Sequence, residues 1–280
     1  MDHYLGGLGF QPEEVIGLHP EHFVAIEHPS FPLVSTFRDV SGVTINAAVD
    51  GTSGFRMQTC GLSGMGSYLV AATQIIPGVV RLELLAEDAE GAQNAVCGAQ
   101  AAHKLVPQTL IVHVDDPHLY GGYEAGPRYS RTIFEDYRLG GVCLEVSTDP
   151  LQALREPELL SPEIPDHSQA ELTCQHAVAS TFVMDVRGVR RKTNSVTGRE
   201  WVLLYGDCGI GQEVGFACSP MQAANIVIGD RISGAVYLSG TTGLWEVGFA
   251  SVKSSHMRRG AKTFELYAPL VGLGAQSMLR

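Results

Sequence analysis

The sequence predicts an α+β fold in two parts, an N-terminal α/β sandwich and a C-terminal five-stranded β-barrel. Three observations favour this class. An apolar stripe of helical period lies among strand-like runs in the first half, and the second half holds short runs of branched and aromatic residues at period two. A proline-rich acidic stretch separates the halves. The predicted domains are 1–148 and 176–280, joined by a linker over 149–175.

The first domain is predicted to begin with an irregular lead-in over 1–30, because His-Pro pairs interrupt it. A helix is expected over 87–105, since Glu87 and Asp88 suit a helix N-terminus and small apolar residues follow at helical spacing. The turn Ile76-Pro77-Gly78 separates two of the expected strands. The four strands are predicted over 69–73, 79–85, 110–114 and 142–146.

The second domain is predicted to hold five short strands, with one short helix after the third. This order of elements, over about residues 178–252, resembles an OB-fold barrel. The linker before it is expected because four prolines and several acids fall within 149–168. The strands are predicted over 181–189, 201–205, 213–218, 231–238 and 245–252, and the helix over 220–226.

The stretch 69–118 combines a strand, a turn, a second strand, an alanine-rich helix and a strand that ends Val112-His113-Val114-Asp115-Asp116-Pro117. It resembles the bacterial microcompartment shell-protein domain, and a ferredoxin-like half-motif has the same elements. The resemblance implies a ring-forming protein in which Ile76, Pro77 and Gly78 line the axis of an oligomer. Residues 44–66, where the family has a helix, are rich in Gly and Ser.

Charge is distributed unevenly along the 280 residues, whose net charge is −11. Residues 1–175 hold 8 basic and 23 acidic side chains, a balance of −15, and residues 176–280 hold 11 and 7, a balance of +4. The acidic half is therefore a poor surface for a polyanion. No apolar run reaches the length of a membrane span, and the N-terminus lacks the build of a signal peptide. We expect a cytoplasmic protein whose six cysteines, none in a C-x-x-C pair, stay reduced.

The leading functional prediction is a non-catalytic, self-assembling ring- or shell-type structural protein. It is expected to form a homo-oligomer, to hold a protein partner or cargo through the barrel, and to need no cofactor. An alternative is an OB-fold protein that binds single-stranded nucleic acid, in which basic residues follow the backbone and aromatic rings stack on bases. The residues for that role are Arg187, Arg190, Arg191, Lys192 and Arg199, with Trp201 and Tyr205 as the stacking rings.

A third possibility is an enzyme. Cys60 could act as a nucleophile with a distant His, or His113 and Asp115 could supply two of the three ligands of an iron site. A phosphate-binding glycine loop of the Walker A or G-x-G-x-x-G type is absent. The stretch 61–65 has Met65 where a serine-hydrolase elbow requires a second glycine.

Overall fold

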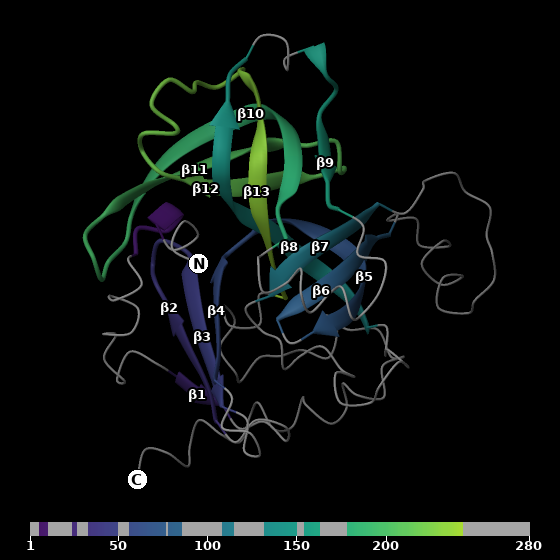
Figure 1. Ribbon diagram of the computed structural model, residues 1–280, viewed down its shortest axis with the longest axis vertical. Helices are drawn as coiled ribbons and strands as arrows, with labels where there is room; N and C mark the ends of the chain where they lie inside the picture. Colours follow the sequence, from purple (N-terminus) through teal and green to yellow (C-terminus); the bar gives the residue numbers. More distant parts are fainter. Residues whose placement is uncertain are drawn as a thin grey trace, which may run out of the picture.

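The computed structural model describes residues 6–10, 24–26, 33–49, 56–76, 78–85, 108–114, 132–149, 154–162 and 178–242. Apart from isolated helical turns at residues 6–7 and 154, every secondary-structure element within these ranges is a β-strand (Figure 1). The predicted α+β class is therefore wrong, and the described part of the chain is a β fold. The strands are β1 (Val24–Ile26), β2 (Leu33–Arg38), β3 (Val43–Val49), β4 (Arg56–Leu62), β5 (Met65–Ile76), β6 (Val79–Leu84), β7 (Thr109–Val114), β8 (Thr132–Ser147), β9 (Glu158–Leu160), β10 (Ser180–Thr193), β11 (Glu200–Asp207), β12 (Glu213–Cys218) and β13 (Arg231–Thr241).

Much of the difference between the predicted and the observed fold comes from two segments that were not predicted to be strands. The Gly- and Ser-rich range 44–66 lies mostly in β3, β4 and β5, and β9 lies inside the range predicted to be a linker. Small polar residues have low strand propensity, but hydrogen bonds to β2 and β4 keep β3 in place. A second sheet therefore takes the place at which the microcompartment shell-protein family has a helix.

Nine strands form one mixed sheet that closes on itself twice. Its hydrogen-bonded order is β11-β12-β8-β5-β6-β7-β13-β10-β9, and two further pairings join β11 to β10 and β8 to β13. One closed ring therefore contains β8, β5, β6, β7 and β13, and the other contains β11, β12, β8, β13 and β10. We call them the lower ring and the upper ring, after their places in Figure 1.

Strands β8 and β13 belong to both rings and pair with each other in antiparallel fashion. On its other edge, β8 pairs with β5 through residues 132–139 and then with β12 through residues 140–142. In the same way, β13 pairs with β10 through residues 231–236 and with β7 through residues 239–240. Each strand of this shared pair changes partner along its length, so the two rings are stacked end to end.

The predicted C-terminal barrel is wrong in one strand, because β8 of the shared pair belongs to it. Four of its five predicted strands are present as β10 to β13, but β8 completes the upper ring, parallel to β12 and antiparallel to β13. Local periodicity locates a strand but carries no information about its partner, so the sequence could not assign β8 to this ring. The range 220–226 is a series of hydrogen-bonded turns and not the predicted helix. The predicted strand over 245–252 and the predicted helix over 87–105 lie outside the described residues.

The strand pairing crosses the predicted domain boundary, because β8 precedes the linker and β13 follows it. A single apolar core also extends through both rings. In the upper ring, Phe182 and Phe216 pack edge to face with their centroids 4.9 Å apart. In the lower ring, the centroids of Phe134 and Tyr137 are 5.8 Å apart. The division into domains stays a prediction, but the described residues of both ranges share one sheet and one core.

The remaining strands form an antiparallel sheet in the order β1-β2-β3-β4. Within the described ranges no strand of this sheet pairs with the nine-stranded sheet, and the two sheets are joined by apolar packing and by hydrogen bonds to side chains. Its Leu62 backbone N–H donates to Ser239 Oγ in β13 at 3.3 Å. The apolar contact between the two sheets consists of Leu8, Phe10, Phe37, Val43, Ile45, Leu62, Val142, Trp201 and Ala217.

Candidate functional site

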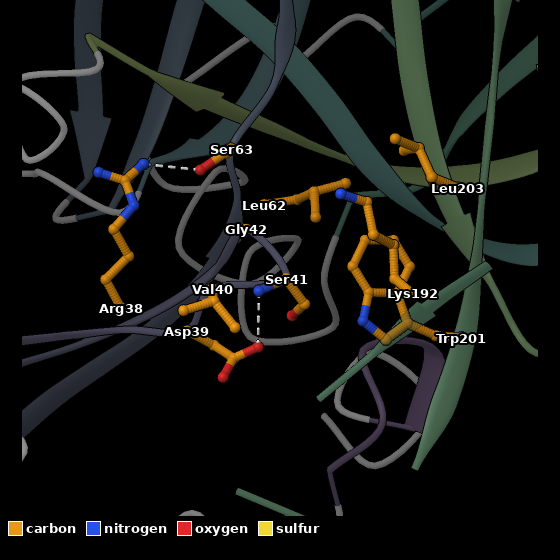
Figure 2. A pocket seen from close by; sticks show the side chains of 10 residues that line it. All are labelled: Arg38, Asp39, Val40, Ser41, Gly42, Leu62, Ser63, Lys192, Trp201 and Leu203. Atoms are coloured by element: carbon orange, nitrogen blue, oxygen red, sulfur yellow. Dashed lines mark hydrogen bonds between the residues drawn. The ribbon is translucent and has the colours of Figure 1, made fainter. Parts of the chain in front are cut away.

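A pocket of about 460 Å³ lies where the four-stranded sheet meets the upper ring (Figure 2). One wall is the β2–β3 turn with the end of β4, and the other is the β10–β11 hairpin. A volume of this size is typical of small-molecule sites. The lining residues are Arg38, Asp39, Val40, Ser41, Gly42, Leu62, Ser63, Lys192, Trp201 and Leu203.

Asp39 builds the turn that forms the first wall. Its backbone N–H donates to Val43 O at 2.8 Å, and Gly42 N–H donates to Asp39 O at 2.9 Å, which closes a tight turn between β2 and β3. The Asp39 carboxylate then accepts the N–H of Ser41 at 2.9 Å, the hydrogen bond of an Asx turn. Gly42 has a φ of 101°, a conformation that favours glycine.

The same carboxylate connects the two walls of the pocket. Asp39 Oδ1 accepts the backbone N–H of Ser195 at 3.1 Å and also the Ser195 hydroxyl, although the two residues are 156 positions apart. Burial alone would raise the pKa of Asp39, but hydrogen bonds from Ser195 and Ser41 outweigh it and hold that pKa below its usual range. The ionised carboxylate therefore fastens the β2–β3 turn to the hairpin, and we call this contact the Asp39–Ser195 latch.

The second wall is the β10–β11 hairpin, in which Lys192 and Trp201 are directly opposed across the two strands. The Trp201 side chain is only 1% exposed, whereas Lys192 is half-buried. The hairpin turn is held by Asn194, whose Oδ1 accepts the N–H groups of Val196 at 2.9 Å and Thr197 at 3.1 Å. These contacts hold in place the strand ends that carry the lysine and the indole.

The pocket lining combines charged side chains with buried hydrogen-bond donors that lack an acceptor. Arg38, Asp39 and Lys192 line it, Arg38 donates to Ser63 Oγ at 2.7 Å, and within the described ranges no acid forms an ion pair with Lys192. The buried Ser41 Oγ and Trp201 Nε1 have no hydrogen-bond partner among the residues that the structure describes. In Figure 2 the Trp201 indole nitrogen is on the side of the β2–β3 turn, and the Lys192 amine ends beside Leu62. A buried donor without an acceptor costs about 1–3 kcal/mol.

Two of the arginines predicted to contact nucleic acid are already paired with acidic side chains. Arg187 forms ion pairs with Asp207 at 3.1 Å and Glu213 at 3.4 Å, and Arg191 forms one with Glu200 at 3.2 Å. A phosphate backbone would have to compete with these acids for the two guanidinium groups. The predicted basic surface therefore already contains its own counter-charges at two positions.

The aromatic residues of that prediction also occupy different environments. The Arg190 guanidinium lies 4.9 Å above the ring of Tyr205 and donates to its hydroxyl at 3.2 Å. Trp201 is buried and offers no open ring face for a base. Arg199 is exposed beside the hairpin turn, and Lys192 belongs to the pocket. Binding of nucleic acid by this set stays a prediction.

The residues of the enzyme alternative lie on different elements. His113 lies in β7 and Cys60 in β4, two strands that are in contact, while Asp115 falls outside the described residues. Burial lowers the pKa of His113 to about 4, and its buried Nε2 has no partner within the described ranges. Those ranges contain no group of three potential metal ligands.

The turn predicted to line an oligomer axis joins β5 to β6. Pro77 lies outside the described residues. Gly78 is buried, and its carbonyl accepts the backbone N–H of Val114 at 3.0 Å. The described end of the turn therefore packs against β7 of its own chain.

A second feature, at the opposite end of the upper ring from the pocket, is an apolar surface. We call it the apical apolar surface and define it as Leu154, Met221, Val227 and Ile228. These side chains are 81%, 85%, 61% and 69% exposed. Two segments carry them, residues 154–157 before β9 and residues 219–230 between β12 and β13, and Figure 1 shows both at the top of the molecule. Arg231 joins the segments by donating to Arg155 O at 2.8 Å.

Sequence reasoning found two lining residues of the pocket, Lys192 and Trp201, but gave them a different role. It missed Asp39 and Ser195, because a hydrogen bond between residues 156 positions apart leaves no local pattern. The one available signal was the sequence Asp39-Val40-Ser41-Gly42, which is typical of a tight turn.

Comparison of the chain with protein-family models, with curated proteins and with solved structures finds no match in any of the three. The resemblances to a microcompartment shell domain and to an OB-fold stay predictions. Within the described ranges, no helix has the length and hydrophobicity needed to cross a membrane.

Proposed function

We propose that the protein is a self-associating structural protein whose copies meet through the apical apolar surface, with the upper ring as its interaction module. The observation that supports the proposal is the exposure of four large apolar side chains at one end of that ring. Exposed apolar groups that gather in one place are characteristic of protein–protein contact surfaces.

The apolar residues project from a segment that is already well ordered by its own contacts. Ser219 and Gln222 exchange hydrogen bonds, and Gln222 Nε2 donates to Leu144 O in β8 at 3.0 Å. Ala223 and Ile226 of the same segment face the core and are 7% and 6% exposed. Core packing therefore accounts for the inward residues, whereas the side chains of Met221, Val227 and Ile228 are exposed and lie outside the core.

The charges around the apical apolar surface suit a second copy of the same chain. Arg155 pairs with Glu158, and Arg231 pairs with Asp185 at 2.8 Å. Basic and acidic groups are thus interspersed around an apolar centre, although the whole chain carries −11. A contact related by twofold symmetry places each basic group near an acid of the other copy, and it brings no excess of one charge into the interface.

The proposal is tested by the mass of the full-length protein in solution, measured by light scattering after size-exclusion chromatography over a range of concentrations. We expect an oligomer, and we expect Ile228→Asp to shift it to the monomer, since a charge at the centre of an apolar contact is costly to bury. Val196→Asp is the matched control, because Val196 is also exposed but lies on the β10–β11 turn. A wild-type monomer at every concentration, or equal masses for both variants and the wild type, would contradict the proposal.

A further inference from the structure

The N-terminal segment, residues 6–10, belongs to neither sheet and has no part in the proposed self-association. We propose that it occupies a peptide-binding site on the outer face of the upper ring, from which a segment of a partner protein with the same chemistry displaces it. That chemistry is an uncharged stretch in which a glycine stands between two large apolar side chains, as in Leu8-Gly9-Phe10. The chain thus carries its own competitor for the site.

Two apolar side chains anchor the segment where the four-stranded sheet meets the upper ring (Figure 1). Leu8 is 0% exposed and Phe10 is 1% exposed. Both pack into the apolar cluster between the two sheets, together with Val142 and Trp201 from strands of the upper ring. A few side chains buried in this way supply most of the free energy of a typical binding contact.

The β10–β11 turn binds the backbone of the segment. Asn194 Nδ2 donates to Leu8 O at 3.2 Å, and the Thr197 hydroxyl donates to Gly9 O at 2.7 Å. Two side chains of one turn therefore engage two successive carbonyls, which fixes the register of the segment. Backbone hydrogen bonds combined with buried side chains are the means by which proteins recognise short peptides.

Glycine is required at two positions of the segment. Gly9 has a φ of 76°, and a Cβ there would also lie 3.3 Å from Arg199 O. A Cβ on Gly7 would lie 2.3 Å from Cγ1 of the buried Val142. A competing segment therefore needs glycine at both places, in addition to the two apolar side chains.

The site is preformed, because the turn is held by hydrogen bonds of its own. The Asn194 backbone N–H donates to Arg199 O, and Gly198 N–H donates to Asn194 O, both at 2.9 Å. Departure of the segment would leave the Asn194 amide without the acceptor that Leu8 O provides and would expose the apolar cluster to water. A segment supplied by a partner restores both contacts without any change in the turn.

The experiment measures binding of a fluorescein-labelled peptide of residues 4–12 to the full-length protein by fluorescence polarisation. The attached segment competes in the wild type, so the peptide should bind weakly there. Leu8→Ala/Phe10→Ala weakens this competitor, and we expect it to bind the peptide at least about tenfold more tightly than the wild type does. Gly9→Ala, which weakens the segment through its backbone and retains both apolar side chains, should act in the same direction. Bound peptide should also raise the melting temperature of both variants.

Controls locate the binding at this site. A peptide that carries Phe10→Asp should not bind, because a charge would have to enter the apolar cluster. In either weakened variant, Thr197→Val should reduce the affinity for the peptide about fivefold, the effect of one lost hydrogen bond. Thr181→Val, the same change at an exposed position at the other end of β10, should leave that affinity unchanged.

Three results would overturn the proposal. The first is the absence of saturable peptide binding to the weakened variants. The second is equal affinity in the wild type and in those variants, which would place the peptide at a site that the attached segment does not occupy. The third is equal affinity after Thr197→Val and after Thr181→Val, or for the original peptide and the one with Phe10→Asp.

Discussion

Eight of the nine strands of the larger sheet lie in closed rings and only β9 is an edge strand, whereas the four-stranded sheet has an open edge on both sides within the described residues. Each strand of a closed ring has a partner on both sides, so no strand can leave without breaking two sets of backbone hydrogen bonds. The four-stranded sheet instead depends on side-chain contacts at one end, namely the apolar cluster around Ile45 and the Asp39–Ser195 latch. Global stability should therefore reside in the closed sheet and local opening in the open one.

The largest expected effect is that of Gly234→Ala, in the strand pair shared by both rings. A Cβ at this position would lie 2.1 Å from Glu145 O, a backbone atom of β8 that cannot move without disturbing both rings. We expect loss of the folded state or destabilisation of at least about 3 kcal/mol, at the upper end of overpacking effects. Chemical denaturation checks this, with Gly6→Ala as the control, because nothing lies within 4 Å of its Cβ. A Gly234→Ala variant as stable as the control would show that the shared pair is not the rigid centre of the fold.

Strand positions were largely readable from the sequence, but strand partners were not. The runs at Val79–Leu84, Thr109–Val114 and Glu213–Cys218 have the branched residues and flanking turns of strands. β8 was predicted only in part, because Gly140-Gly141 in its middle resembles a break. Those glycines allow close strand packing, since a Cβ at Gly141 would lie 2.7 Å from Tyr237 O. The pocket was beyond prediction for the same reason as the ring closures, because its walls are distant in sequence.

The next effect in size is a pH dependence that tests the closed sheet alone. His113 sits in β7 between Val79 of β6 and Ser239 of β13. Burial lowers its pKa from about 6.5 to about 4, so as pH falls the unfolded chain takes up the proton before the folded protein does. The stabilisation is complete above about pH 6.5 and is lost toward pH 4, a difference of about 3 kcal/mol.

The free energy of unfolding should be measured from pH 7.5 to pH 4 for the wild type and for His113→Gln, which cannot take up the proton. We expect a smaller loss of stability with acid in the variant. The same pH dependence in both proteins would mean that the folded ring does not lower the pKa of His113.

The smallest expected effect concerns the open sheet. Ser195→Ala removes the hydroxyl that donates to Asp39 but retains the backbone donor, and hydrogen bonds to charged groups contribute about 1.5–3 kcal/mol. Because Ser195 is exposed, we expect a cost near the lower limit, about 1.5 kcal/mol. Hydrogen exchange should accelerate in β2, β3 and β4 while β8 and β13 stay protected. Equal acceleration in both sheets would remove the distinction between a closed and an open region.

The shared strand pair has a consequence for the order of events during synthesis. Both rings require β13, and β13 is made about one hundred residues after β8 and later still than β5. Until residues 231–241 emerge from the ribosome, β5, β6, β7 and β8 can pair locally but leave hydrogen-bonding edges open. Pairings this distant in sequence form slowly, and unpaired strand edges invite contact with other chains. The nascent protein therefore spends a long interval with both rings unclosed, and the pairing of β13 closes both of them.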